Sequence, residues 1–146
     1  MIAYIDSSVL VQAYLTDEDG HAAARSMLED PEVISVTATW SRIEVSGALV
    51  RAGRAGRCNT PDLLRTLDGE LADDGPVTLV GVAQDEAEEK ALELVRAHGI
   101  RALDAWHLAV AALTLPDLVD PGEPSAFATR DASQANVAKS LGFEVI

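Results

Sequence analysis

The stretch IAYIDSS at residues 2–8 decides the fold class. Its four apolar residues, Ile2–Ile5, lack the polar alternation of a half-exposed strand, which predicts a strand buried on both faces. A helix is expected to follow at once, over residues 7–15. Asp6 therefore stands between the end of a buried strand and the start of a helix, as in the opening unit of an α/β fold.

Short β-rich runs and longer helical runs continue to alternate along the chain. Further strands are predicted over 33–36, 77–82, 125–129 and 143–146. Further helices are predicted over 17–28, 39–54, 61–71, 84–98, 103–115 and 132–141. Strands that alternate with helices indicate a parallel sheet with helices on both faces. No internal repeat or linker interrupts the pattern, so we expect a single α/β domain over residues 1–146.

The chain is strongly acidic, with 11 basic and 24 acidic residues and a net charge of −13. This balance argues against broad coating of nucleic acid, which needs clustered Lys and Arg. It allows a site where carboxylates hold a metal. Cys58 is the only cysteine, which forbids an internal disulfide and fits a reducing compartment. With no signal-peptide pattern and no apolar run of membrane-spanning length, we expect a cytoplasmic protein and no membrane partner.

Four acidic residues occupy the places where sites of such folds form. Asp6 and Asp131 each follow a predicted strand, whereas Asp104 and Glu44 lie in the first turns of predicted helices. Because sites in parallel sheets gather beyond the carboxyl ends of the strands, we expect the four side chains to point into one crevice. Carboxylates held together repel unless protons or cations neutralise them, and oxygen-only ligands favour Mg²⁺ or Mn²⁺.

Each of these acids also has a purely structural interpretation. Asp6 and Asp131 fit helix N-caps, and Asp131 with Gln134 has capping-box spacing. Ser41 and Glu44 fit a capping box still better. Asp104 fits a first-turn acid that complements the helix dipole. Only the joint pattern favours a metal site.

The histidines and the cysteine are interpreted as structural. His107 lies in an apolar helix and is expected to be a packing residue. His21 and His98 share no spacing with it that indicates a zinc site. Cys58 has no evident His partner for nucleophilic catalysis.

Four short motifs follow one another along the chain: Tyr4-Ile5-Asp6-Ser7-Ser8, Glu44 in its predicted helix, Leu103-Asp104-Ala105 and Thr129-Arg130-Asp131. In this order they resemble the motifs of PIN-domain ribonucleases. The closest similarity is to the small VapC-type toxins of bacterial and archaeal toxin–antitoxin pairs, and it covers essentially the whole chain. The resemblance implies a three-layer α/β/α PIN-like fold around a central parallel sheet. It further implies Mg²⁺- or Mn²⁺-dependent cleavage of RNA, a homodimer, and neutralisation by a small cognate antitoxin protein.

Residue by residue, the resemblance implies a catalytic and metal-binding quartet with two supporting hydroxyl groups. Ser8, two positions after the first acid, matches a hydroxyl position that supports the site. Thr129 matches the small hydroxylic residue before the last acid. The quartet itself is Asp6, Glu44, Asp104 and Asp131.

The basic residues concentrate at one place, where Arg51, Arg54 and Arg57 follow one another at three-residue spacing. On a helix, Arg51 lies seven residues from Glu44 and nearly above it, with Arg54 rotated to the side. This placement predicts that Arg51 and Arg54 contact the RNA backbone. A solubilising helix end, or a docking surface for an antitoxin, explains the cluster equally well.

Two other functions stay open. A non-catalytic PIN-fold interaction module would share the fold and need no metal. A Mg²⁺-dependent phosphatase of the haloacid-dehalogenase type also places an Asp after its first strand. That phosphatase needs a second Asp where this chain has Ser8, and a downstream Lys for which the chain has no clear candidate.

Overall fold

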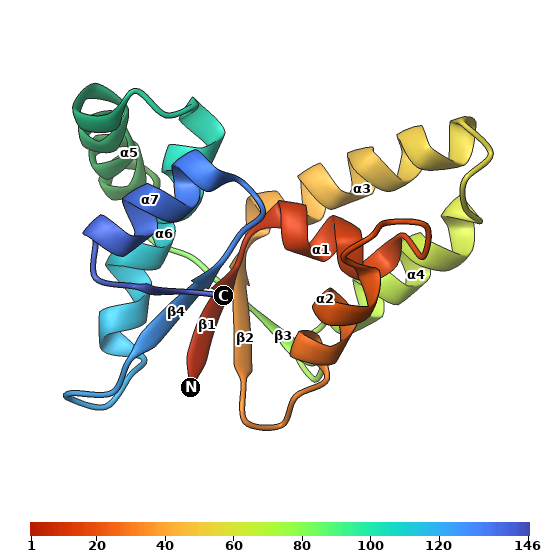
Figure 1. Cartoon of the computed structure of the whole chain (residues 1–146), viewed down its shortest axis with the longest axis horizontal. Coiled ribbons are helices and arrows are strands. Elements are labelled where there is room, and N and C mark those ends of the chain that lie inside the picture. Colours follow the sequence, from red (N-terminus) through yellow and green to blue (C-terminus); the bar gives the residue numbers. More distant parts are fainter.

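The computed structural model describes all residues, 1–146, as a five-stranded sheet with seven α-helices (Figure 1). The strands are β1 (Ile2–Ile5), β2 (Ile34–Ala38), β3 (Val77–Val80), β4 (Ser125–Ala128) and β5 (Glu144–Val145). The helices are α1 (Ser7–Tyr14), α2 (His21–Leu28), α3 (Thr39–Arg54), α4 (Thr60–Glu70), α5 (Gln84–His98), α6 (Ala102–Thr114) and α7 (Ala132–Ser140), with a 3₁₀ turn after α6 (Leu115–Asp117).

The sheet is parallel throughout, with the strand order β3-β2-β1-β4-β5. β1 is the central strand, and its residues Ala3, Tyr4 and Ile5 are fully buried. This confirms the strand buried on both faces that the apolar run predicts.

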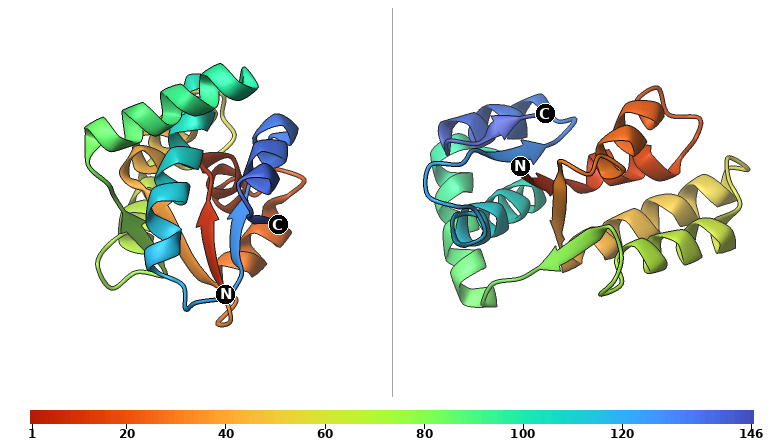
Figure 2. Two further views of the ribbon diagram at one scale, coloured as in Figure 1. Left: turned by 90° about the vertical axis from the view of Figure 1, so that its left-hand side faces the viewer. Right: turned by 90° about the horizontal axis from the view of Figure 1, so that it is seen from below.

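Helices cover both faces of the sheet and make three layers (Figure 2). Ile5 points into the core shared with α1, α2, α3 and α4. Tyr4 points to the opposite face, where α5, α6 and α7 pack. There its ring stacks on Phe127 of β4, with ring centroids 5.3 Å apart. The structure therefore confirms the three-layer α/β/α architecture.

The chain path places a topological switch point beside β1. From β1 the chain runs outward through β2 to β3 on one side, then crosses to β4 on the other side of β1. The carboxyl ends of β1 and β4 therefore adjoin, and the Asp6 N–H donates to the Ala128 carbonyl at 3.0 Å. In open α/β sheets the crevice at such a point is where ligands bind. The segments that follow β1 and β4 both open into it.

One predicted helix start is wrong. α2 begins at His21, not at residue 17, whereas the other elements begin and end within two residues of their predicted bounds. The acidic residues Asp17, Glu18 and Asp19 form a turn before α2, and Arg57 holds Asp17 (2.7 Å) and Glu18 (2.6 Å) there from across the fold. The charges of Asp17 and Glu18 serve an ion pair and not the helix N-terminus.

The predicted capping box at the start of α3 is also wrong. The N-cap is Ala38, which makes no side-chain cap bond. Ser41 Oγ instead lies 2.6 Å from Thr37 Oγ1, which itself donates to the Ile5 carbonyl. Glu44 is thereby left free of the helix end.

None of the helices combines the length and the apolar character needed to cross a bilayer.

Candidate active site

A pocket of about 450 Å³ opens at the carboxyl ends of β1 and β4. It is lined by all four acids of the predicted quartet, which come from four separate segments of the chain. Two arginines line it as well. The acidic and basic lining residues are Asp6, Glu44, Asp104, Asp131, Arg51 and Arg101.

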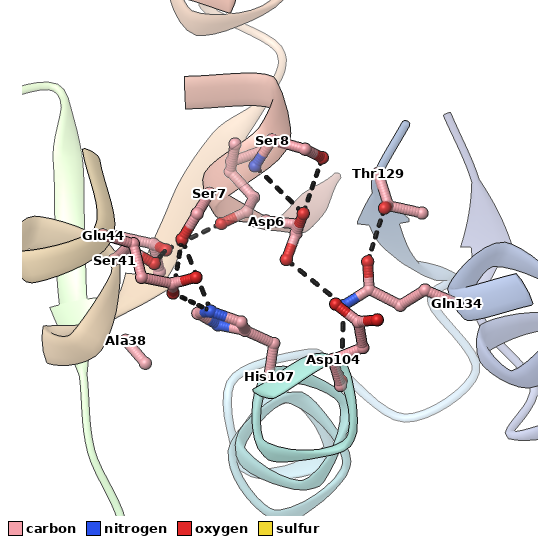
Figure 3. A network of polar contacts seen from close by, with 12 residues as sticks. Asp6, Ser7, Ser8, Ala38, Ser41, Glu44, Asp104, His107, Thr129 and Gln134 are labelled. Carbon is pink, nitrogen blue, oxygen red and sulfur yellow. Dashed lines mark hydrogen bonds and ion pairs between the residues drawn. The ribbon is translucent and has the colours of Figure 1, made fainter. Parts of the chain in front are cut away.

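Asp6 lies at the centre of the site and is only 6% exposed (Figure 3). Its Oδ2 accepts hydrogen bonds from the Ser8 backbone N–H (3.0 Å) and from Ser8 Oγ (2.6 Å). Asp6 is therefore the N-cap of α1, as the structural interpretation expects. Its other oxygen, Oδ1, accepts from Gln134 Nε2 at 3.2 Å. Capping and a place in the acidic pocket are thus combined in one residue.

Gln134 of α7 is a site residue, although the sequence interpretation placed it only in a capping box with Asp131. It is fully buried, and its Nε2 also donates to the Asp104 backbone carbonyl at 3.3 Å. Its Oε1 accepts from Thr129 Oγ1, which fixes the orientation of the amide. One amide therefore ties β1, the start of α6 and the end of β4 together. The only sequence signal for it is its place three residues after Asp131.

The supporting hydroxyls lie where they hold the loops of the pocket. Ser8 Oγ accepts from the Arg130 backbone N–H at 3.1 Å while it donates to Asp6. Thr129 Oγ1 accepts from the Asp131 backbone N–H at 3.1 Å. Each hydroxyl thus connects the segment after β4 to another part of the site.

Glu44 projects from α3 toward the pocket and is held through one oxygen. Its Oε1 accepts from Ser7 Oγ at 2.8 Å and from His107 Nε2 at 2.5 Å. Burial opposes its ionisation, but these two donors outweigh the burial and hold the pKa of the Glu44 carboxyl below its ordinary range. Glu44 is consequently a carboxylate, with Oε2 left without a protein partner.

His107 is buried in α6, as the packing interpretation expects, and it is also hydrogen-bonded into the site. It is 1% exposed, and its Nδ1 lies 2.7 Å from Tyr4 Oη. Tyr4 Oη accepts from the Ala38 backbone N–H at 3.2 Å, so its own hydrogen points to His107 Nδ1. That leaves the proton of His107 on Nε2, directed at Glu44. Burial raises the pKa of Tyr4, with the charge of Asp6 adding to it, so the phenol stays a neutral donor.

Asp104 and Asp131 both accept hydrogen bonds from Arg101, a residue that the sequence interpretation missed. Arg101 Nε donates to Asp104 Oδ2 at 2.8 Å, and Nη2 donates to Asp131 Oδ2 at 3.1 Å. These contacts raise the pKa of the Arg101 guanidinium further above its ordinary range. Asp131 Oδ1 caps α7 by accepting from the Gln134 backbone N–H at 2.8 Å. Arg101 precedes Asp104 by three residues, and that spacing on a helix is the signal that could have found it.

Only one arginine of the predicted basic cluster faces the pocket. Arg51 lines it and forms no ion pair. Arg54 is exposed in the last turn of α3, outside the pocket lining. Arg57 is held by Asp17 and Glu18.

The donor set fits a hard cation in its chemistry. Four carboxylates face two guanidinium groups, so the pocket keeps two negative charges (4 − 2). Carboxylate oxygens are the ligands that Mg²⁺ and Mn²⁺ prefer. As the side chains stand, no three His, Cys, Asp or Glu residues are grouped closely enough to hold a metal ion. In the structure the positive charge beside these acids is the Arg101 guanidinium, which joins Asp104 and Asp131.

Comparison with known proteins agrees with this architecture. The sequence pattern of the PIN domain family matches residues 3–139. The structure of VapBC-1 from nontypeable Haemophilus influenzae matches with a TM-score of 0.59 at 16% identity, covering 100% of this chain and 97% of that one. At that identity the likeness concerns the fold. A search of curated proteins gave no significant match.

Proposed function

The chain belongs to the PIN domain family, and from this premise we propose that it is a metal-dependent endoribonuclease that hydrolyses RNA phosphodiester bonds. One observation carries the proposal. Four carboxylates from four segments line one pocket at the switch point of the sheet, in excess over the arginines beside them. A pocket that only stabilised the fold would not concentrate negative charge in this way.

Asp6 and Asp104 are the residues we assign to direct metal binding. Asp6 is fixed by Ser8 and Gln134, and Asp104 Oδ1 has no protein partner. Glu44 and Asp131 would act through bound water. When bound, Mg²⁺ or Mn²⁺ lowers the pKa of a water molecule and polarises the phosphoryl oxygen.

Glu44 would orient the attacking water. Its Oε1 is held by Ser7 and His107, so Oε2 is the oxygen free to accept a hydrogen bond from that water. Attack by water on phosphorus would leave a 5′-phosphate and a 3′-hydroxyl. This chemistry needs neither a pair of histidines nor the RNA 2′-hydroxyl as nucleophile. It therefore agrees with a pocket that is lined by no histidine and in which the buried His107 only positions Glu44.

The arginines of α3 would bind the substrate backbone. Arg51 lines the pocket without a carboxylate partner, so its guanidinium is free for a phosphate. Arg54, further along the same helix, would contact the RNA beyond the pocket. Arg57 is engaged with Asp17 and Glu18 and is left out of this role.

The biological role we propose is that of a toxin in a type II toxin–antitoxin pair. The PIN family membership and the fold shared with VapBC-1 support this role. Such a toxin would act on RNA in the cytoplasm as a homodimer and be held inactive by a small cognate antitoxin.

Replacing Asp6 with Asn tests the proposal. With Mn²⁺ and single-stranded RNA, wild-type protein should give EDTA-sensitive cleavage, and Asp6→Asn should lose it because a ligand charge is gone. Asn keeps the oxygen that caps α1, so the fold should persist by circular dichroism. Asp68→Asn is the matched control, because Asp68 pairs with exposed Arg42 away from the pocket. Cleavage by Asp6→Asn at the wild-type rate would overturn the proposal, as would a wild-type protein that binds RNA without cutting it.

A further inference from the structure

Arg101 occupies the acidic pocket in an unusual way. Its side chain is 77% exposed, yet its guanidinium reaches back to Asp104 Oδ2 (2.8 Å) and Asp131 Oδ2 (3.1 Å). It is the N-cap residue of α6 but makes no side-chain cap bond. Its contacts in the structure are therefore with the two acids and not with the helix end.

Arg101 and a divalent ion would compete for the charge of the same two carboxylates. The guanidinium holds Oδ2 of Asp104, and it holds Oδ2 of Asp131, the oxygen that does not cap α7. A divalent ion beside these acids meets the positive charge of the guanidinium, so its binding favours release of the arginine. Because ion pairs of a largely exposed side chain are weak, the displacement is easy but measurable.

A displaced Arg101 stays at the rim of the pocket. It precedes Asp104 by three residues at the start of α6, and it lines the same pocket as Arg51. A guanidinium released there is exposed, charged and shaped for two parallel hydrogen bonds to a phosphate. RNA entering an acidic pocket needs such a cation, because the carboxylates repel its backbone.

We propose that Arg101 is a two-position residue that neutralises Asp104 and Asp131 in the metal-free protein and moves to an RNA phosphate when a divalent ion takes those acids. The inference rests on the proposed function. It gives one side chain opposite effects on the two ligands, opposing the metal and favouring the RNA. A residue with only a structural role at the start of α6 would not do this, since its loss would weaken both.

The first measurement is Mn²⁺ affinity without RNA, by isothermal titration calorimetry on the full chain. Arg101→Gln should bind Mn²⁺ about three- to tenfold more tightly than wild type, because a competitor and a positive charge are gone. Arg42→Gln is the matched control. It removes an arginine from an exposed ion pair, with Asp68 at 2.7 Å, that lies outside the pocket. Its Mn²⁺ affinity should stay within about twofold of wild type.

The second measurement is RNA cleavage at saturating Mn²⁺. Arg101→Gln should raise KM for single-stranded RNA about tenfold, because a charge-assisted contact to phosphate is lost. Arg42→Gln should leave KM unchanged. Equal or weaker Mn²⁺ binding by Arg101→Gln, or an unchanged KM, would overturn the inference while the proposed function stood. A wild-type protein that neither binds Mn²⁺ nor cleaves RNA would instead overturn the proposed function, and this inference with it.

Discussion

Two clusters of charged side chains in this molecule are built on opposite principles. In the Glu70 cluster, Glu70 of α4 accepts from Tyr14 (2.7 Å) and from both Nη atoms of Arg25 (3.0 Å each). Arg25 also holds Glu29 at 2.9 Å, but that side chain is 65% exposed and lies in solvent. In the half-buried part of the cluster, one carboxylate meets one guanidinium and one hydroxyl. In the pocket beyond β1 and β4, four carboxylates face two guanidinium groups.

The difference separates charge used for stability from charge used for chemistry. A half-buried carboxylate with matched partners recovers its desolvation cost through its hydrogen bonds. A pocket with surplus carboxylates does not, and proteins retain such arrangements mainly at functional sites. Replacing a carboxylate with its amide should therefore lower activity when it is made in the pocket, and lower stability when it is made in the Glu70 cluster.

The largest expected effect is on catalysis, in Asp104→Asn. Loss of a metal-binding charge should lower the RNA cleavage rate at least about a thousandfold, or about 4 kcal/mol in activation free energy. The free energy of unfolding should change by less than about 1 kcal/mol, because the partner Arg101 is mostly exposed. Cleavage is measured on labelled RNA, and stability by urea unfolding. A variant that unfolds readily but cuts normally when folded would reverse the comparison.

Glu70→Gln is the matching change in the Glu70 cluster. The Arg25 side chain is 25% exposed and that of Glu70 is 17% exposed, so the neutral amide leaves this guanidinium with only the exposed Glu29 as a charged partner. We expect a loss of about 1–3 kcal/mol in the free energy of unfolding. RNA cleavage below the melting temperature should be unchanged. Loss of cleavage by the folded variant would break the separation between the two clusters.

Tyr14→Phe should have a smaller effect that depends on pH. Burial, aided by the hydrogen bond to Glu70, raises the pKa of Tyr14 above its ordinary value of 10.0. The folded state thus disfavours the phenolate, so the stability from Tyr14 is fully present below about pH 10 and is lost as pH rises above it.

Phe removes both the hydrogen bond and the titration. Tyr14→Phe should lose about 1 kcal/mol at pH 7 and show a flatter fall in stability above pH 10 than wild type. Chemical unfolding at pH 7 to 11 measures both. Equal alkaline slopes for the two proteins would contradict the role of Tyr14.

The smallest expected effect is on substrate binding, in Arg51→Ala. Removal of one phosphate contact should weaken RNA affinity a few-fold and lower the slope of log affinity against log salt by about 0.7. Fluorescence anisotropy over a salt series measures both. Arg57→Ala is the control, because Arg57 already pairs with Asp17 and Glu18. Identical salt slopes for wild type and Arg51→Ala would remove Arg51 from the RNA contact.

Local signals in the sequence predict most of the fold. α5 has its predicted bounds, since acids occupy its first turn and Gly99 ends it with a positive φ of 67°. The start of α2 was mispredicted because the partner of Asp17 and Glu18, Arg57, lies about forty residues away. Charge alone does not tell a helix N-terminus from a distant ion pair.

The residues of the candidate site also divide into those that local signals predict and those whose partners lie far away in the sequence. The acids could be found because each follows a strand or lies in the first two turns of a helix, and the sequence pattern predicts these positions. His107 and Gln134 could not, because their roles depend on Glu44, 63 residues from His107, and on Asp6, 128 residues from Gln134. A histidine in an apolar helix has the same local pattern whether it packs or holds a carboxylate.

The central claim is that the surplus carboxylates of the pocket bind a divalent metal. A crystal structure grown with Mn²⁺, with the metal located by anomalous scattering, tests it most directly. We expect an anomalous peak coordinated by Asp6 and Asp104, with Arg101 no longer hydrogen-bonded to Asp104. A saturating Mn²⁺ concentration that leaves no peak in the pocket, with Arg101 still joining Asp104 and Asp131, would contradict it.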